Sequence, residues 1–138
     1  VRNHPKYQQD VIFVGKITGL DLIKFYHLGD LFITASETET QGIVLIEAAA
    51  TGLPIIAVDA GAVKEVCVDQ FNGFLCRPKD VDALASGITA ILTDLNLAKT
   101  MSKNSLTISK KHDLNFTLSR FEEIYQMVIK NHQNSVKK

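Results

Sequence analysis

The sequence predicts an α/β domain with a doubly wound parallel sheet, in which helices cover both faces of the strands. Short apolar runs of strand type alternate along the 138 residues with segments of helical periodicity. Residues 54–58 are apolar without polar alternation, which is typical of a strand buried on both faces. The length is that of about one domain, since a domain takes roughly 100–200 residues.

The expected elements follow from apolar spacing and from turn residues. Gly15 and Gly29 close the first strand and the first helix, while Gly52 and Pro54 stop the central helix. Asp80 is placed to cap a later helix. In order, we expect strand 11–14, helix 20–28, strand 31–34, helix 43–50, strand 54–58, a short helix opened by Gly61, a strand after the Asn72-Gly73 turn, and helices 81–92, 95–110 and 114–131. We expect one domain over residues 1–131 and a frayed polar tail over 132–138.

Composition excludes several classes of function. Fifteen Lys and Arg balance fifteen Asp and Glu, so a general attraction to nucleic acid is not expected. No apolar run reaches the ~18 residues of a membrane span, and the first residues lack the apolar core of a signal peptide. Cys67 and Cys76 have no metal-ligand spacing. We therefore expect a soluble, cytoplasmic domain.

The chemistry is expected in the loops after the first two strands, residues 15–19 and 35–42. Ligands of open parallel sheets bind beyond the carboxyl ends of the strands. The second loop leads into a helix whose free N–H groups favour a phosphate. Glu39 and Glu47 would repel a phosphate that they faced, so they suit hydroxyl groups on either side of it. A ligand that carries hydroxyl groups, then phosphate, then hydroxyl groups again is a sugar nucleotide.

These residues resemble a known family. Glu39, seven residues, Glu47, a small-residue helix and the Gly52-Leu53-Pro54 turn look like the signature of retaining glycosyltransferases of family four. Phe13-Val14-Gly15 before this stretch and Asn72-Gly73-Phe74-Leu75 after it agree. The resemblance covers residues 11–92 and implies a Rossmann-like domain, the C-terminal half of a GT-B fold. Phe25-Tyr26 and Gly29-Asp30 look closest to bacterial enzymes that glucosylate diacylglycerol or related lipids.

The resemblance also implies a role for each matching residue. Glu39 would be the catalytic residue that orients the transferred sugar, and Glu47 would hold the ribose hydroxyls. The resemblance implies neither a metal nor a cofactor. The other expected contacts are to donor sugar and diphosphate by Thr40, Gln41, Gly42, Ile43 and Val44, and to the nucleobase by Gly15, Lys16 and Ile17.

The implied partners are a nucleoside-diphosphate sugar, with UDP-glucose favoured, an acceptor domain of the same enzyme, and a lipid or saccharide acceptor. Relatives usually hold the leaving diphosphate with an Arg and a Lys on a loop before the first strand. Here that region offers only Arg2 and Lys6, so the domain resembles a donor-binding half that is shortened at its N-terminus. The complete enzyme could contact the inner face of a membrane.

Other interpretations stay open. A nucleotide-binding module without turnover of its own is the main alternative. A glycoside hydrolase would need Glu37 or Glu39 to face Glu47 at roughly 5–10 Å. Glu65 could approach the sugar or be a first-turn helix acid, and Asp80-Val81-Asp82 is better explained as a helix cap than as a metal motif.

Overall fold

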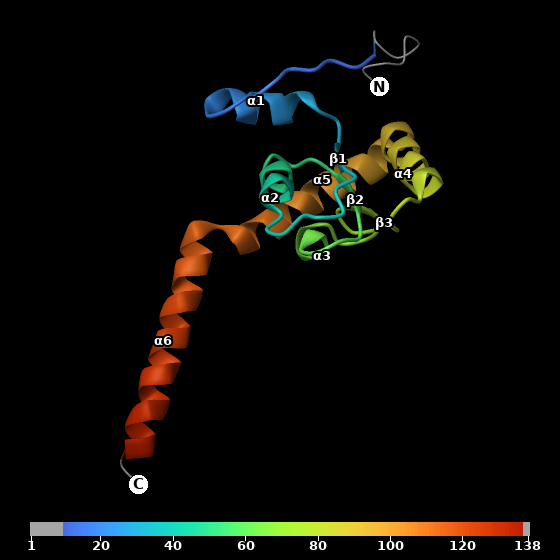
Figure 1. The fold of residues 1–138 in the computed structure, drawn as a ribbon. Coiled ribbons are helices and arrows are strands. Elements are labelled where there is room, and N and C mark those ends of the chain that lie inside the picture. The colour runs from blue at the N-terminus through green and yellow to red at the C-terminus, as the bar shows by residue number, and fades with distance from the viewer. Residues whose placement is uncertain (1–9, 137–138) are drawn as a thin grey trace.

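The structure, a computed structural model, describes residues 10–136, in which helices surround a small parallel sheet (Figure 1). The strands β1 (Phe32–Thr34), β2 (Ile55–Val58) and β3 (Gly73–Cys76) lie in the order β1-β2-β3. Both pairings are parallel, which confirms the expected α/β class. The helices are α1 (Leu20–Leu28), α2 (Ile43–Ala50), α3 (Val63–Val66), α4 (Val81–Thr93), α5 (Leu95–Ser109) and α6 (Leu114–Val136), with a short 3-10 helix at Lys110–His112.

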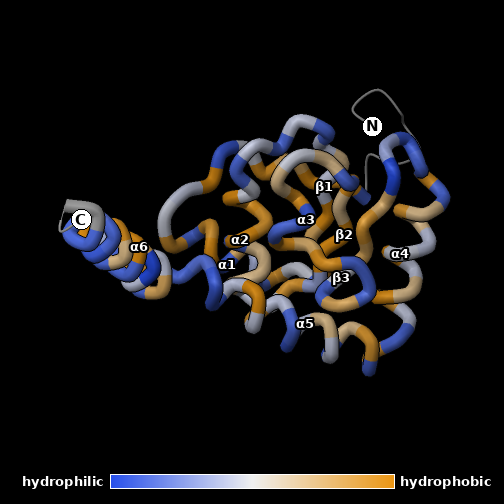
Figure 2. Tube along the Cα trace, turned by 90° about the horizontal axis from the view of Figure 1, so that it is seen from below, coloured by the Kyte–Doolittle hydropathy of each residue, from blue (hydrophilic) through white to orange (hydrophobic). Residues whose placement is uncertain are grey.

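The central strand β2 is buried along its whole length and separates two apolar clusters. Its side chains alternate, so Ile55 and Ala57 face one cluster while Ile56 faces the other. The first cluster includes Leu45, Ala48, Ala49, Val63, Val66, Cys67 and Ile108, and the second includes Cys76, Ile91 and Met101. Figure 2 shows the hydrophobic segments gathered between the helices. Helices therefore cover both faces of the sheet, as the apolar composition of residues 54–58 predicts.

The strand expected at residues 11–14 does not form. Ile12 is 83% exposed and Phe13 is 59% exposed, and the segment runs along the outside of the domain (Figure 1). Apolar and β-branched residues make a strand only where a neighbouring strand accepts and donates ladder hydrogen bonds. In the described part of the chain the sheet consists of β1, β2 and β3, and residues 11–14 are not one of its strands.

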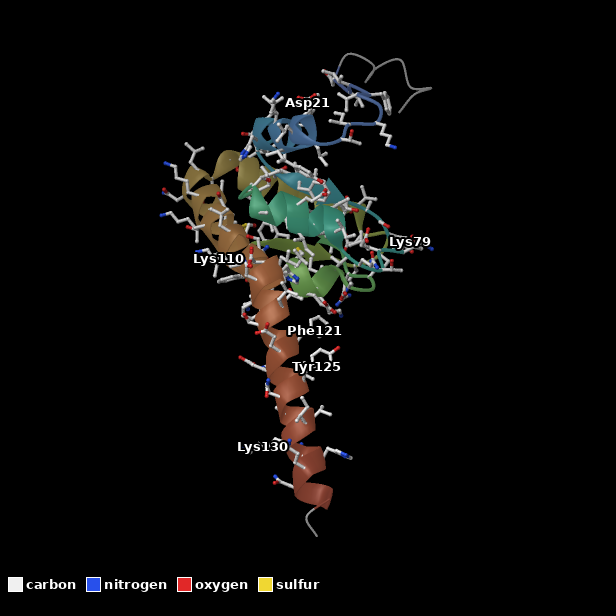
Figure 3. All side chains as sticks on the ribbon, turned by 90° about the vertical axis from the view of Figure 1, so that its left-hand side faces the viewer. Asp21, Lys79, Lys110, Phe121, Tyr125 and Lys130 are labelled. Carbon is white, nitrogen blue, oxygen red and sulfur yellow. The ribbon has the colours of Figure 1, made fainter. Side chains whose placement is uncertain are left out.

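Helix α6 extends away from the rest of the domain (Figure 1) and continues through most of the tail that we expected to fray. No Gly or Pro interrupts residues 114–136, and a helix satisfies its own backbone hydrogen bonds whatever its side chains are. Phe121 and Tyr125 project from the same side of α6 (Figure 3) and are 53% and 65% exposed. None of the described helices alone has the length and apolar composition of a membrane span. The segments Val81–Thr93 and Leu95–His112 reach that length and composition only together, and they are bent by 102° at their junction.

A buried polar joint ties the β3 turn to the helices. The Asn72 side chain is fully buried, accepts a hydrogen bond from Val68 N–H (2.8 Å) and donates one to Val66 carbonyl (2.9 Å). Its amide also contacts the hydroxyl of buried Ser105 (3.4 Å), which donates to the Leu53 carbonyl (2.7 Å). This joint holds α3, α5 and the start of β2 in one arrangement.

Candidate functional site

Two loops meet at the carboxyl edge of the sheet, residues 35–42 after β1 and residues 59–62 after β2. Parallel neighbours end at the same edge, so the loops that follow them lie side by side. Ala62 N–H donates to the Glu39 carbonyl (3.3 Å). Gly61 has a positive φ of +52°, and a Cβ there would collide with the same Glu39 carbonyl. The glycine thus permits the contact that sets the backbone of Glu39.

The Glu39 carboxylate is fixed by the backbone of its own loop. Its Oε1 accepts a hydrogen bond from Gly42 N–H (2.9 Å) and a longer one from Gln41 N–H (3.4 Å). The side chain is half-buried and lies at the positive end of the α2 dipole, which favours a negative charge. Glu39 is therefore an ordered carboxylate at a helix start and not a freely solvated loop residue.

The start of α2 presents unused hydrogen-bond donors. Gly42 precedes the helix with φ 65° and ψ 18°, a left-handed conformation that suits glycine. Its carbonyl accepts from Leu45 and Ile46, but within residues 10–136 no acceptor meets the N–H groups of Ile43 and Val44. Two free N–H groups at a helix N-terminus can bind an anion such as a phosphate.

Glu47 lies one turn further along α2 and is held from another helix. Its Oε2 accepts a hydrogen bond from the Tyr26 hydroxyl of α1 at 2.9 Å. The Tyr26 ring packs on Phe32 of β1, with ring centroids 5.9 Å apart. Burial, followed by the hydrogen bond and the charge of Glu47, raises the pKa of Tyr26 to about 12. The hydroxyl therefore stays protonated and donates at neutral pH.

Within the part of the chain that the structure describes, several other candidate residues show no hydrogen bond or ion pair to Glu39 or Glu47. The loop at Gly15, Lys16 and Ile17 does not follow a strand, and the described residues show no hydrogen bond or ion pair from it to Glu39 or Glu47. Its role with the nucleobase stays a prediction. Glu37 is exposed in the first loop, and Glu65 is exposed in the first turn of α3. Arg2 and Lys6 lie outside the described residues.

Residues Thr40 and Gln41 complete the first loop, and both side chains are exposed beside the start of α2. Asp80 caps α4 by accepting a hydrogen bond from Ala83 N–H (2.9 Å), which confirms the helix-cap interpretation. Among the described residues, no group of three or more His, Cys, Asp or Glu side chains could hold a metal ion.

Two residues of this site were not predicted from the sequence. Tyr26 was used as a position of helix 20–28 and in the family resemblance but was assigned no contact with Glu47, although a tyrosine at an otherwise apolar position carries a hydroxyl that needs a partner. Gly61 counted only as a helix opener, although a glycine next to a strand end signals a close approach of another backbone. Both residues touch a glutamate of the predicted pair, and so both belong to the site.

Comparison with known sequences agrees with this geometry. The sequence model described as "Glycosyl transferases group 1" matches residues 4–107, most of the chain. Sulfoquinovosyl transferase SQD2 of Arabidopsis thaliana is 31% identical over 105 residues, covering 74% of this chain and 21% of that protein. The chain spans between about a fifth and a third of the length of the first curated relatives it matches.

Solved structures share the fold. Sucrose-phosphate synthase from Thermosynechococcus elongatus superposes with a TM-score of 0.80 at 28% identity, covering 91% of this chain and 32% of that one. The C-terminal domain of the group 1 glycosyl transferase LpcC from Francisella tularensis gives 0.70 at 29% identity, covering 79% and 57%. Anabaena HepE, solved in complex with UDP, gives 0.69 at 25% identity, covering 78% and 30%. The chain therefore belongs to the glycosyl transferases group 1 family and has the fold of the C-terminal domain of a GT-B glycosyltransferase.

Proposed function

We propose that this chain is the nucleotide-sugar-binding domain of a retaining glycosyltransferase. The enzyme would transfer a hexose, with glucose favoured, from a UDP-sugar to an acceptor. One observation carries the proposal. The free N–H groups of Ile43 and Val44 lie at the start of α2, in the segment between the ordered carboxylates of Glu39 and Glu47. That order matches a ligand with a sugar, a diphosphate and a ribose. HepE, a structural neighbour with bound UDP, supports uridine as the nucleoside.

In this proposal the diphosphate leaves toward the start of α2. Negative charge develops on the leaving phosphate oxygens as the glycosidic bond breaks, and the fixed N–H groups and the helix dipole stabilise it there. The acceptor hydroxyl attacks the sugar from the same face, and its proton passes to the departing phosphate oxygen. Glu39 orients the sugar, and its own loop fixes its carboxylate for that role through Gly42 N–H. No covalent intermediate on the protein is required.

We further propose a lipid or saccharide acceptor, with a diacylglycerol-type lipid favoured. The support is the sequence resemblance around Phe25-Tyr26 and Gly29-Asp30 described above. In the complete enzyme an acceptor domain would select that molecule, and a lipid acceptor would bring the enzyme to the inner face of a membrane from the cytoplasm.

Titration of the chain with nucleotides tests donor binding. UDP, GDP and ADP and their glucose conjugates are compared by calorimetry and by amide chemical shifts. We expect saturable binding of UDP and UDP-glucose, with shifts spreading over residues 40–47. Preference for another nucleoside diphosphate would correct the donor, whereas the absence of saturable binding to all six compounds would refute the proposal.

Glutamine substitutions separate the roles of the two glutamates. Glu39→Gln keeps an oxygen that can accept from Gly42 N–H, so the loop and the affinity for UDP should change little. It removes the charged carboxylate that orients the sugar, and we therefore expect turnover of the complete enzyme to fall roughly 100-fold or more. Glu47→Gln should weaken UDP binding roughly 10-fold because it removes a charged acceptor of ribose hydroxyls. Glu122→Gln, on the exposed surface of α6, is the matched control. Normal turnover and affinity in both site variants would show the assignments to be wrong.

A nucleotide-binding module without turnover is the second candidate. The chain covers only 21% and 32% of two curated relatives, so donor binding by the chain does not by itself imply sugar transfer. The two properties are therefore measured separately. Transfer of labelled glucose from UDP-glucose to diacylglycerol vesicles, and to water, distinguishes the two. UDP binding without either product from the complete protein would favour the module.

A further inference from the structure

The Tyr26–Glu47 contact joins two helices at the proposed ribose position. The two residues are 21 positions apart, and their hydrogen bond is partly buried. No second donor to the Glu47 carboxylate is found within the part of the chain that the structure describes. An ionised carboxylate offers about four acceptor positions, so one bond from tyrosine leaves capacity for a pair of adjacent hydroxyl groups.

The Tyr26 ring is itself held in place. It contacts the Phe32 ring in a tilted arrangement, with 48° between the ring planes, and packs against the buried cluster that contains Leu45 and Ala48 of α2. On α1 and β1 it also borders an apolar pocket of about 210 Å³ with Leu22, Phe25 and Leu53. Phe32 and this cluster hold the ring while its hydroxyl contacts Glu47, which is how a second residue preorganises a ligand-binding group.

We propose that Tyr26 is a positioning residue, whose hydroxyl fixes the Glu47 carboxylate in the orientation that binds the two ribose hydroxyls. This inference rests on the proposed function. The alternative is that the contact only joins α1 to α2. The two differ in one respect: positioning affects ligands that carry the ribose diol, whereas a joint between helices affects all ligands equally.

Tyr26→Phe tests the inference because it removes the hydroxyl and keeps the ring on Phe32 and beside the pocket. Wild type and variant chains are titrated with UDP and with 2′,3′-dideoxy-UDP. We expect the variant to lose about 5- to 10-fold in affinity for UDP, less than the full contribution of one hydrogen bond to a charged group because the hydroxyl acts through Glu47, and less than 2-fold for the dideoxy compound. Tyr125→Phe, at an exposed position of α6, is the matched control and should bind both as wild type does.

A double-substitution cycle completes the test. In a Glu47→Ala background we expect Tyr26→Phe to have no further effect on UDP affinity, because the group that it positions is gone. Equal losses for UDP and dideoxy-UDP, or unchanged UDP affinity, would overturn the positioning role and leave the proposed function standing. If the wild type binds none of the six nucleotides saturably, both the inference and the proposed function are overturned; if it prefers another nucleoside diphosphate, the same comparison is made with that nucleotide and its 2′,3′-dideoxy form.

Discussion

The hydroxyl of Tyr26 lies where ionisation is opposed by burial and by the neighbouring Glu47 carboxylate, and its pKa rises to about 12. An unfolded tyrosine has a pKa near 10, so the folded chain holds this proton more tightly than the unfolded chain. The stabilisation that this difference contributes is fully present below about pH 10 and is lost as the pH rises toward 12.

The free energy of unfolding should therefore fall between about pH 10 and pH 12, and part of that fall should depend on Tyr26. Urea unfolding at a series of pH values measures it in the wild type and in Tyr26→Phe. We expect a shallower decline in the variant, which has no phenol at this position. Parallel pH profiles for the two proteins would contradict the assignment of the raised pKa to this contact.

At the scale of residues, the sequence singled out two glutamates but not the contacts that surround them. Glu39 and Glu47 were proposed from their spacing, from the helix start between them and from the family resemblance, and their roles stay predictions. Their backbone and side-chain partners, Gly61 and Tyr26, come from segments 22 and 21 positions away. Contacts at such separation depend on the packing of whole elements, which residue spacing along one segment does not encode.

At the scale of elements, the burial of β2 and the exposure of residues 11–14 show what composition can determine. Both segments are apolar, and both were predicted as strands. β2 has a parallel neighbour on each side, whereas residues 11–14 lie outside the three-stranded sheet of the described residues. Composition indicates that a segment can form a strand, but the presence of a partner decides whether it does.

The joint at Asn72 connects several elements, and its removal should destabilise the domain. Asn72→Ala leaves the buried Val66 carbonyl and the part-buried Val68 N–H without their partner, for which we expect a loss of about 3 kcal/mol. Asn104→Ala is the matched control, because Asn104 also bonds a carbonyl, that of Phe71 (2.8 Å), but at an exposed position. We expect it to cost no more than about 1 kcal/mol in urea unfolding. Equal losses in the two variants would contradict a special role for the buried joint.

At the scale of the whole molecule, the two apolar clusters each contain one thiol, Cys67 in the first and Cys76 in the second. Cys67 is fully buried and Cys76 is 4% exposed. Burial raises the pKa of Cys67 to about 12 and also raises that of Cys76, so little reactive thiolate exists at neutral pH. The reactivity of each thiol can therefore be used to detect exposure of the cluster on its own face of the sheet.

Both thiols should react with an aromatic disulfide reagent only when the domain unfolds. At pH 8 we expect negligible labelling of the native chain within minutes, and labelling that follows the urea unfolding curve for both thiols together. Cys67→Ala and Cys76→Ala variants identify which thiol reacts. Separate transitions would show that the two clusters unfold independently, and rapid labelling without urea would contradict the observed burial.

The close approach of Gly61 to the Glu39 carbonyl has a consequence for laboratory evolution. A randomised library selected only for stable folding should tolerate many side chains at position 39 but retain glycine at position 61, since any Cβ there displaces the neighbouring loop. Selection for sugar transfer should then restrict position 39 as well. Sequencing both pools would thus distinguish position 61, which is needed for the loop conformation, from position 39, which is needed for sugar transfer.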